Sequence, residues 1–320
     1  MRSYCYPALT PEEQISLLVQ KGLIITDLEN AKRWLKHVGY FRLNVYMRHF
    51  KDYNGREGRF LEGTDFKHII DLYSFDRDLR DIIFDGIEMI EVAVKSLISD
   101  RMSCKHGPHW YLNSSNFTSS YDSAGLESFL KENCNQQSDY HFIRGYMREF
   151  TTPEFPPSWM IMELLTFGKI SLMFEHLGDP EVRNDICHYF GSAKNLLPSW
   201  LHAFTFIRNK CAHHSKLVFT TTPIRPVMPI RQNKRFLNEA EIVDNASLYC
   251  ILACMQFVIS KIDPDARFKE RLLNLIAKFP DFDYRQMGFT PEWQKEDLFL
   301  ISNPSQQYYS PTPGGRELLS

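Results

Sequence analysis

The sequence predicts an all-α fold, a helical bundle with long central helices. Three observations lead to this class. Apolar residues recur at three- and four-residue steps over most of the chain, and helix start and stop signals bracket the apolar segments. The alternation of apolar and polar residues that is typical of β-strands never runs longer than four or five residues. The chain has 320 residues, 43% of them hydrophobic and 24% charged, which is typical of a folded globular protein with a sizeable core.

The first two expected helices carry their own end signals. In residues 10–22, Thr10 can cap the helix start while Glu13 supplies the reciprocal bond of a capping box. Residues 26–40 repeat this design from Thr26, again with a glutamate three residues later.

A long helix is expected at residues 66–99, about 50 Å of helix at 1.5 Å per residue. Residues 41–60 precede it and end in a glycine-rich turn, and Gly86 is a position where the helix could break. A loop rich in Gly, Pro, Ser and Asn follows at residues 104–123. One apolar face runs through Leu72, Phe75, Leu79, Ile82, Ile83, Ile87, Ile90, Val94 and Leu97.

The second half is expected to hold four more helices. They fall at residues 158–178 (with an irregularity at Gly168), 195–219, 246–262 and 265–279. Proline-rich breaks lie at residues 152–159 and 220–232. After about Asn303 the composition is that of a flexible tail.

Nothing in the sequence predicts a membrane partner. The longest apolar stretch begins at Leu248, spans about fifteen residues and contains Gln256 and Lys261, so it falls short of the roughly 20 residues of a membrane span. The first residues turn polar before any apolar run of signal-peptide length. The seven cysteines are odd in number and form no CxxC pair, which favours a reducing, cytoplasmic location.

Charge is nearly balanced overall, at −2, but it is unevenly distributed. Residues 186–238 contain eight Lys or Arg and four His but no Asp or Glu, and residues 32–59 contain eight Lys or Arg against two acids, with aromatic residues between them. Basic side chains neutralise phosphates and aromatic rings stack on unpaired bases, so both windows suggest RNA as a partner. The alternative is a solvated charged face above core aromatics, and it stays open here.

The stretch RNKCAHHSKL, residues 208–217, concentrates reactive side chains. On an ideal helix Asn209 and His213 share one face, whereas Arg208 and His213 lie about 140° apart. The two converge more easily if the helix distorts, or if a second copy of the chain supplies the missing groups across a two-fold axis.

These residue types suit metal-independent RNA cleavage. Histidine can transfer protons near neutral pH, arginine can hold and stabilise a phosphate, and Asn209 can orient an imidazole. Together they could drive attack of an RNA 2′-hydroxyl on its neighbouring phosphate, leaving a 2′,3′-cyclic phosphate. No metal or other cofactor is expected. Other readings remain open: a structural histidine pair, a nucleophilic Cys211 beside His214, or a zinc site made from Cys211, His213 and His214 or from Cys104, His106 and His109.

RNKCAHHSKL resembles the R-N-x-C-A-H-H-x-R-L signature of the Abi-like abortive-infection proteins, the AbiD/AbiF group of the HEPN superfamily. It departs at Lys216, where arginine is usual. Four further segments resemble motifs of that family in the same order: TPEEQISLLVQKGLII with VGYFRLNVY, DLYSFDRDLRDIIFDGIEMIE, SWMIMELLTFGKIS and MGFTPEWQKEDLF.

The resemblance implies a HEPN-type helical bundle with an N-terminal helical extension, working as a homodimer in phage defence. HEPN ribonucleases carry an R-x4–6-H motif, which fits the spacing from Arg208 to His213 and to His214. Some relatives are restrained by a small structured RNA encoded beside them. We accordingly expect an N-terminal helical segment that could bind RNA at residues 1–62, a HEPN domain at 63–285 and a C-terminal segment with a tail at 286–320.

We therefore predict a metal-independent endoribonuclease. His213 is the leading general acid–base residue and His214 the second proton handler, Arg208 binds the scissile phosphate, and Asn209 orients His213. An acidic residue, Glu163 in preference to Glu91, could orient Arg208 through an ion pair. Further RNA contacts are expected from Lys210, Lys216, Arg77, Arg80 and Arg42, although Arg77 and Arg80 could instead pair with nearby aspartates on the surface.

Two rival functions remain at this stage. One is a non-catalytic binder of a small structured RNA, which would use the same basic windows. The other is a HEPN toxin that is silenced by a partner protein.

Overall fold

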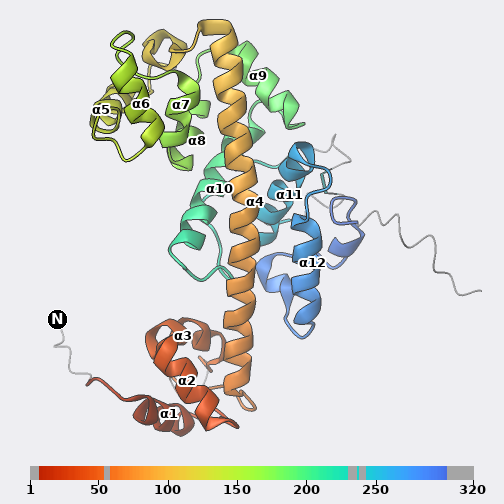
Figure 1. Ribbon diagram of the computed structural model, residues 1–320. Helices are drawn as coiled ribbons and strands as arrows, with labels where there is room; N and C mark the ends of the chain where they lie inside the picture. The colour runs from red at the N-terminus through yellow and green to blue at the C-terminus, as the bar shows by residue number, and fades with distance from the viewer. Residues whose placement is uncertain (1–6, 54–57, 230–235, 238–242, 301–320) are drawn as a thin grey trace, which may run out of the picture.

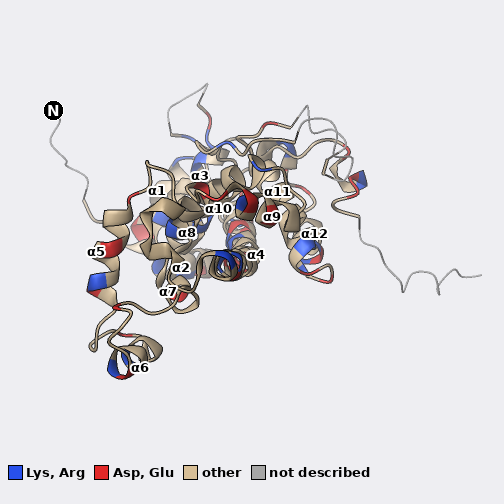
Figure 2. Cartoon of the chain, turned by 90° about the horizontal axis from the view of Figure 1, so that it is seen from above, with Lys and Arg blue, Asp and Glu red and all other residues tan. Residues whose placement is uncertain are grey.

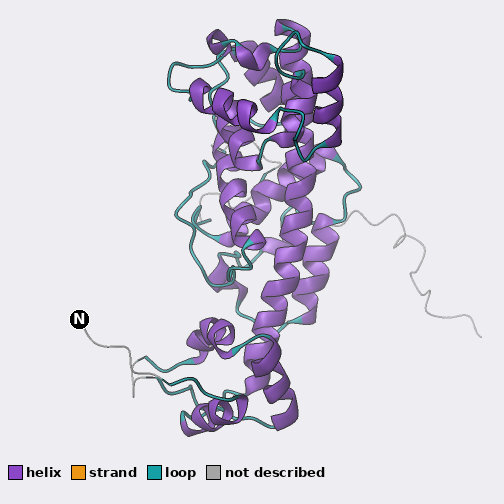
Figure 3. Cartoon of the chain, turned by 60° about the vertical axis from the view of Figure 1, so that its left-hand side comes forward, coloured by secondary structure: helices purple, strands orange, loops and turns teal. Residues whose placement is uncertain are grey.

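The structure is a computed structural model that describes residues 7–53, 58–229, 236–237 and 243–300. These residues form twelve α-helices and five short 3-10 helices, and the β-pairs among them are isolated bridges (Figure 3). The all-α prediction is confirmed. Within the described ranges, no helix combines the length and the apolar character needed to cross a bilayer. The tail expected after Asn303 lies outside these ranges.

Helix α4, Phe66–His106, is the central axis of the molecule (Figure 1). Its 41 residues make about 60 Å of helix, and it runs seven residues beyond the predicted end, into the segment expected to be a loop. Gly86 does not interrupt it. A Cβ atom at Gly86 would lie 2.7 Å from Phe268 Cδ2, so the glycine allows another helix to approach closely.

Three short helices lie near the first turns of α4, where α3 packs against α4, and α1 packs against α2 (Figure 1). They are α1 Pro11–Gln20, α2 Leu28–His37 and α3 Tyr40–Met47. The capping box of α1 is confirmed, since the Glu13 N–H donates to Thr10 Oγ1 at 3.3 Å and the Thr10 N–H donates to Glu13 Oε2 at 2.7 Å. The predicted cap of α2 at Thr26 is wrong, because the Asp27 carboxylate accepts the Asn30 N–H at 2.9 Å and starts the helix one residue later.

Five helices surround the far half of α4 (Figure 1). They are α5 Ser123–Asn133, α6 His141–Glu149, α7 Ser158–Leu164, α8 Phe167–Glu175 and α9 Pro180–Tyr189. The single helix predicted at residues 158–178 is wrong. It is divided into α7 and α8, because Thr166 leaves the helical conformation and its hydroxyl caps α8 by accepting the Lys169 N–H at 3.4 Å.

The remaining helices pack along the middle of α4 (Figure 1). They are α10 Leu196–Ala212, α11 Leu248–Ile262 and α12 Phe268–Lys278. Every residue of α11 from Leu248 to Ile259 is buried, so the prediction of a core helix there is confirmed. Basic and acidic residues both occur on many of the helices (Figure 2), so an interface for a polyanion has to be a local feature.

Candidate functional site

Helix α10 ends inside the RNKCAHHSKL motif, and both histidines lie beyond its last residue. His213 is the capping residue, and His214 has a left-handed backbone with φ 52°. The His214 N–H donates to the Cys211 carbonyl at 2.9 Å, and the Ser215 N–H donates to the Lys210 carbonyl at 2.8 Å. This pair of bonds is a Schellman motif, whose left-handed position usually holds glycine. The continuous helix predicted at residues 195–219 is therefore wrong.

The end of α10 changes the expected geometry of the motif. Arg208 reaches toward α4, with its guanidinium carbon 5.8 Å from the centre of the Phe84 ring. Its Nη1 also donates to Asn209 Oδ1 at 3.5 Å, so Asn209 contacts the arginine where we had expected it to orient His213. Asn209 and His213 do remain neighbours through the backbone, since the His213 N–H donates to the Asn209 carbonyl at 3.0 Å, and both side chains are exposed.

A groove of about 820 Å³ lies beside the motif, between α3, α4, α12 and the end of α10. His214 lines this groove. Its lining includes four basic and three acidic residues: Arg42, Arg77, Arg80 and Arg271, and Asp81, Asp85 and Glu88. His214 thus lines the groove, whereas His213, which is exposed at the cap of α10, does not.

Among the groove arginines, Arg42 is the one best placed to form an ion pair with a negatively charged ligand. Arg271 pairs with Asp85 at 2.7 Å, and Arg77 pairs with Asp78 at 2.8 Å. Among the described residues, Arg42 forms no ion pair and donates instead to the His214 carbonyl at 3.0 Å. It therefore ties α3 to the motif and still carries an uncompensated charge beside His214.

A buried polar network holds the chain that follows α10. Both side-chain oxygens of Asp76, which is fully buried in α4, accept hydrogen bonds. Oδ1 accepts the N–H groups of Leu217 at 2.9 Å and Val218 at 2.8 Å, and Oδ2 accepts the Tyr46 hydroxyl at 2.7 Å. Oδ2 also pairs with Arg80, which is 5% exposed. One carboxylate thus joins α3, α4 and the segment after the motif.

This network corrects the expected position of Arg80. We had expected its side chain at the surface, in contact with RNA or paired with Asp76, Asp81 or Asp85. Arg80 does pair with Asp76, but the pair is buried, and the Tyr46 hydroxyl lies 3.3 Å from Arg80 Nη1. Nη1 also lies 3.4 Å from the Ser215 carbonyl. The missed signal was spacing, because Asp76 and Arg80 fall on the same face as the apolar residues of α4.

The two motif lysines lie over aromatic rings. Lys216 Nζ is 5.7 Å from the Tyr46 ring and 5.8 Å from the Phe219 ring, and burial lowers the pKa of Lys216. Lys210 Nζ lies 5.7 Å from the ring of Phe206. Neither lysine lines the groove, so their contacts with an RNA would have to be made from outside it.

The cysteine and metal readings gain no support from the geometry. Cys211 is 5% exposed, and burial raises the pKa of its thiol to about 12, so the nucleophilic thiolate is scarce at neutral pH. His106 hydrogen-bonds the Asp179 carboxylate at 2.7 Å. Within the described part of the chain, no three His, Cys, Asp or Glu side chains are grouped so that they could hold a metal ion.

Neither predicted acid reaches Arg208. Glu163 is exposed on α7 and lines a separate hollow beside the far half of α4. Glu91 pairs with Lys95, one turn along α4, at 2.9 Å. The expected ion pair fails because α7 packs on a later part of α4 than the Phe84 turn that Arg208 touches.

Comparison with known proteins supports the family resemblance over the central part of the chain. A family model described as Abi-like protein matches residues 33–218, more than half of the chain. The match includes the whole buried network around Asp76 and ends just after the histidine motif. No curated protein and no solved structure gave a significant match. The chain belongs to the family of Abi-like abortive-infection proteins.

Proposed function

We propose that this protein is a metal-independent endoribonuclease of phage defence, with a HEPN-type site at the end of α10. The observation that carries the proposal is the local grouping of Arg208, Asn209 and two histidines beside a groove with a free arginine, Arg42. General acid–base groups and a cation for the phosphate are the parts that RNA cleavage by its own 2′-hydroxyl requires.

The reaction balances with these groups alone. One imidazole takes the proton of the 2′-hydroxyl as its oxygen attacks the adjacent phosphorus. The bond from phosphorus to the 5′-oxygen breaks, and the leaving oxygen takes a proton from a second acid. The products are a 2′,3′-cyclic phosphate and a 5′-hydroxyl. Arg208 stabilises the charge that develops on the phosphate oxygens. We retain His213 as the leading acid–base residue and His214 as the second.

We place the RNA backbone along the groove that His214 lines. Arg42 supplies a free charge there. Arg77 adds a second, because its pair with Asp78 is exposed and such pairs contribute little that a phosphate could not replace. Arg80 acts by holding the segment after the motif, since its charge is committed to Asp76.

A homodimer forms part of the proposal. Asn209 and His213 are exposed at the end of α10, and the Arg208 side chain is turned toward Phe84 of α4. A second copy placed against this helix end would bring its own histidines toward the Arg208 of the first. Such a composite site would resolve the angular separation between Arg208 and His213.

The test is RNA cleavage in EDTA by the wild type and by the Arg208→Ala, His213→Ala and His214→Ala variants. Arg148→Ala on exposed α6 is the matched control. We expect products that end in a cyclic phosphate, a rate loss of about a hundredfold or more for Arg208→Ala and His213→Ala, and no change in the control. Tight binding of intact RNA by the wild type would favour the non-catalytic binder instead. Alanine variants that cut at the wild-type rate would refute the site.

A further inference from the structure

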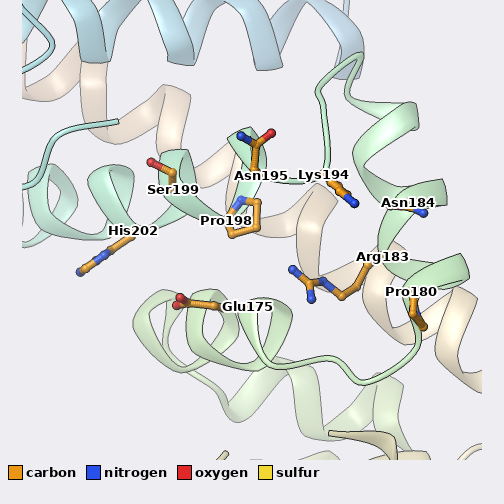
Figure 4. A pocket seen from close by; sticks show the side chains of 9 residues that line it. All are labelled: Glu175, Pro180, Arg183, Asn184, Lys194, Asn195, Pro198, Ser199 and His202. Carbon is orange, nitrogen blue, oxygen red and sulfur yellow. The ribbon is translucent and has the colours of Figure 1, made fainter. Parts of the chain in front are cut away.

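A second hollow, of about 610 Å³, lies at the other end of α10. It is enclosed by the end of α8, by α9, and by the beginning of α10 with the chain before it (Figure 4). Arg183 projects from α9, Lys194 from the connection and His202 from α10 (Figure 4). Glu175, on α8, is the one acid among the nine lining residues.

Arg183 and Lys194 are available to a ligand. The acids of α9 are turned toward α4, where Asp179 pairs with Lys105 at 2.9 Å and Asp185 pairs with Arg101 at 2.7 Å. Among the residues that the structure describes, Arg183 and Lys194 form no ion pair, although Arg183 is half-buried. Two cations against one acid in a concave site favour an anion.

The lining suits a phosphate better than a nucleobase. It contains no Phe, Tyr or Trp side chain on which a base could stack. Its other polar groups are the amides of Asn184 and Asn195, the hydroxyl of Ser199 and the imidazole of His202. Ser199 Oγ already accepts the Val227 N–H at 2.8 Å, which leaves its O–H as a donor.

One exposed face of α10 connects this pocket to the histidine motif. Asn195, His202 and Asn209 are spaced by seven residues, so they stay within about 40° of one another on the helix. Residues 186–238 contain no Asp or Glu, so no acid of α10 or of its flanking segments interrupts this face. Its length is about 20 Å, so an RNA strand of a few nucleotides can lie along it with its phosphates facing the helix.

We propose that this pocket is a phosphate-binding subsite for the RNA strand, a few nucleotides from the phosphate that is cut. The subsite rests on the proposed function, because it takes the same RNA as the histidine motif. Arg183 and Lys194 hold the distant phosphate, while Glu175 limits the affinity by repulsion. Long RNAs therefore engage both ends of α10, and short RNAs engage only the motif.

Binding of 2′-O-methyl RNA, which lacks the nucleophile, tests the subsite without cleavage. Fluorescence anisotropy is measured over a range of salt for a 12-nucleotide RNA. The Arg183→Gln/Lys194→Gln double variant is expected to bind about fivefold more weakly, in keeping with exposed ion pairs, and to flatten the slope of log affinity against log salt by about 1.4. Glu175→Gln is expected to bind more tightly than the wild type. The matched control is Arg148→Gln/Lys278→Gln, two exposed cations outside this pocket, in which binding should not change.

Length dependence decides between this subsite and other outcomes. On a 2-nucleotide RNA the double variant should bind like the wild type, since so short a strand cannot span α10. Equal binding of the 12-nucleotide RNA by the wild type and the double variant would overturn the proposal. So would tight binding of 5′-AMP or 5′-UMP that is lost in Arg183→Gln, because the pocket would then be a mononucleotide site. Failure of the wild type to cut unmodified RNA would refute the nuclease, and cleavage by Arg208→Ala at the wild-type rate would refute the catalytic site, while the binding results would stand in either case.

Discussion

Replacing Asp76 with asparagine should both destabilise the fold and lower the rate of RNA cleavage at the proposed site. The change keeps the shape of the side chain but removes its charge and replaces one acceptor oxygen with an NH₂ donor. Oδ1 faces two backbone N–H groups, and Oδ2 faces the Tyr46 hydroxyl and Arg80. Whichever way the amide turns, a donor meets a donor, and the buried guanidinium of Arg80 loses its counter-charge.

The magnitude follows from the burial of the pair. The Asp76 and Arg80 side chains are 0% and 6% exposed, and removing one partner of a buried pair costs about 3–5 kcal/mol. The same helix offers a control, Asp71→Asn, whose partner Lys67 is also four residues away but 75% exposed. That change should cost under about 1 kcal/mol.

Urea unfolding followed by circular dichroism measures both variants, and RNA cleavage is assayed where each is still folded. We expect folded Asp76→Asn to cut about a hundredfold more slowly, because a segment held next to the histidines loses its anchor, and we expect Asp71→Asn to cut normally. An Asp76→Asn protein within 1 kcal/mol of the wild type would refute the energetic reasoning. A destabilised variant that cuts at the full rate would refute the positioning role.

Three further predictions come from single residues. His214→Gly should raise the free energy of unfolding by up to about 1 kcal/mol, because glycine suits the left-handed position, and it should lower the cleavage rate. A loss of stability in a urea titration would contradict this prediction. Cys211→Ala should keep the cleavage rate within a few fold of the wild type, since burial raises the pKa of this thiol to about 12. Loss of activity in a folded variant would support Cys211 as a nucleophile. Burial opposes ionisation of Asp179, but hydrogen bonds from Lys105 and His106 outweigh burial and hold the pKa of this carboxyl well below its usual range. The ionised carboxylate therefore stabilises the fold fully above about pH 4, and this stabilisation is lost as the pH falls further. The gap in Tm between wild type and Asp179→Asn, measured by thermal melts, should therefore narrow from pH 7 to pH 3, and a gap that widens would show the opposite sign.

Much of the fold could be predicted from local pattern. The all-α class, the capping box at Thr10, the long central helix and the buried helix from Leu248 follow from periodicity and from short-range hydrogen bonds. Errors occurred where a short-range signal was ambiguous. A threonine inside an apolar run divided α7 from α8, and Asp27 rather than Thr26 capped α2.

The sequence by itself determined which side chains form the proposed site, because RNKCAHHSKL resembles a signature of the Abi-like family, whose model matches residues 33–218. Tertiary structure decided how these side chains are used. Asp76 holds Val218 across 142 positions of sequence, and Arg42 reaches the His214 carbonyl across 172. No local propensity encodes such contacts, since they arise only when α3, α4 and the end of α10 pack together. That packing forms the groove that His214 lines.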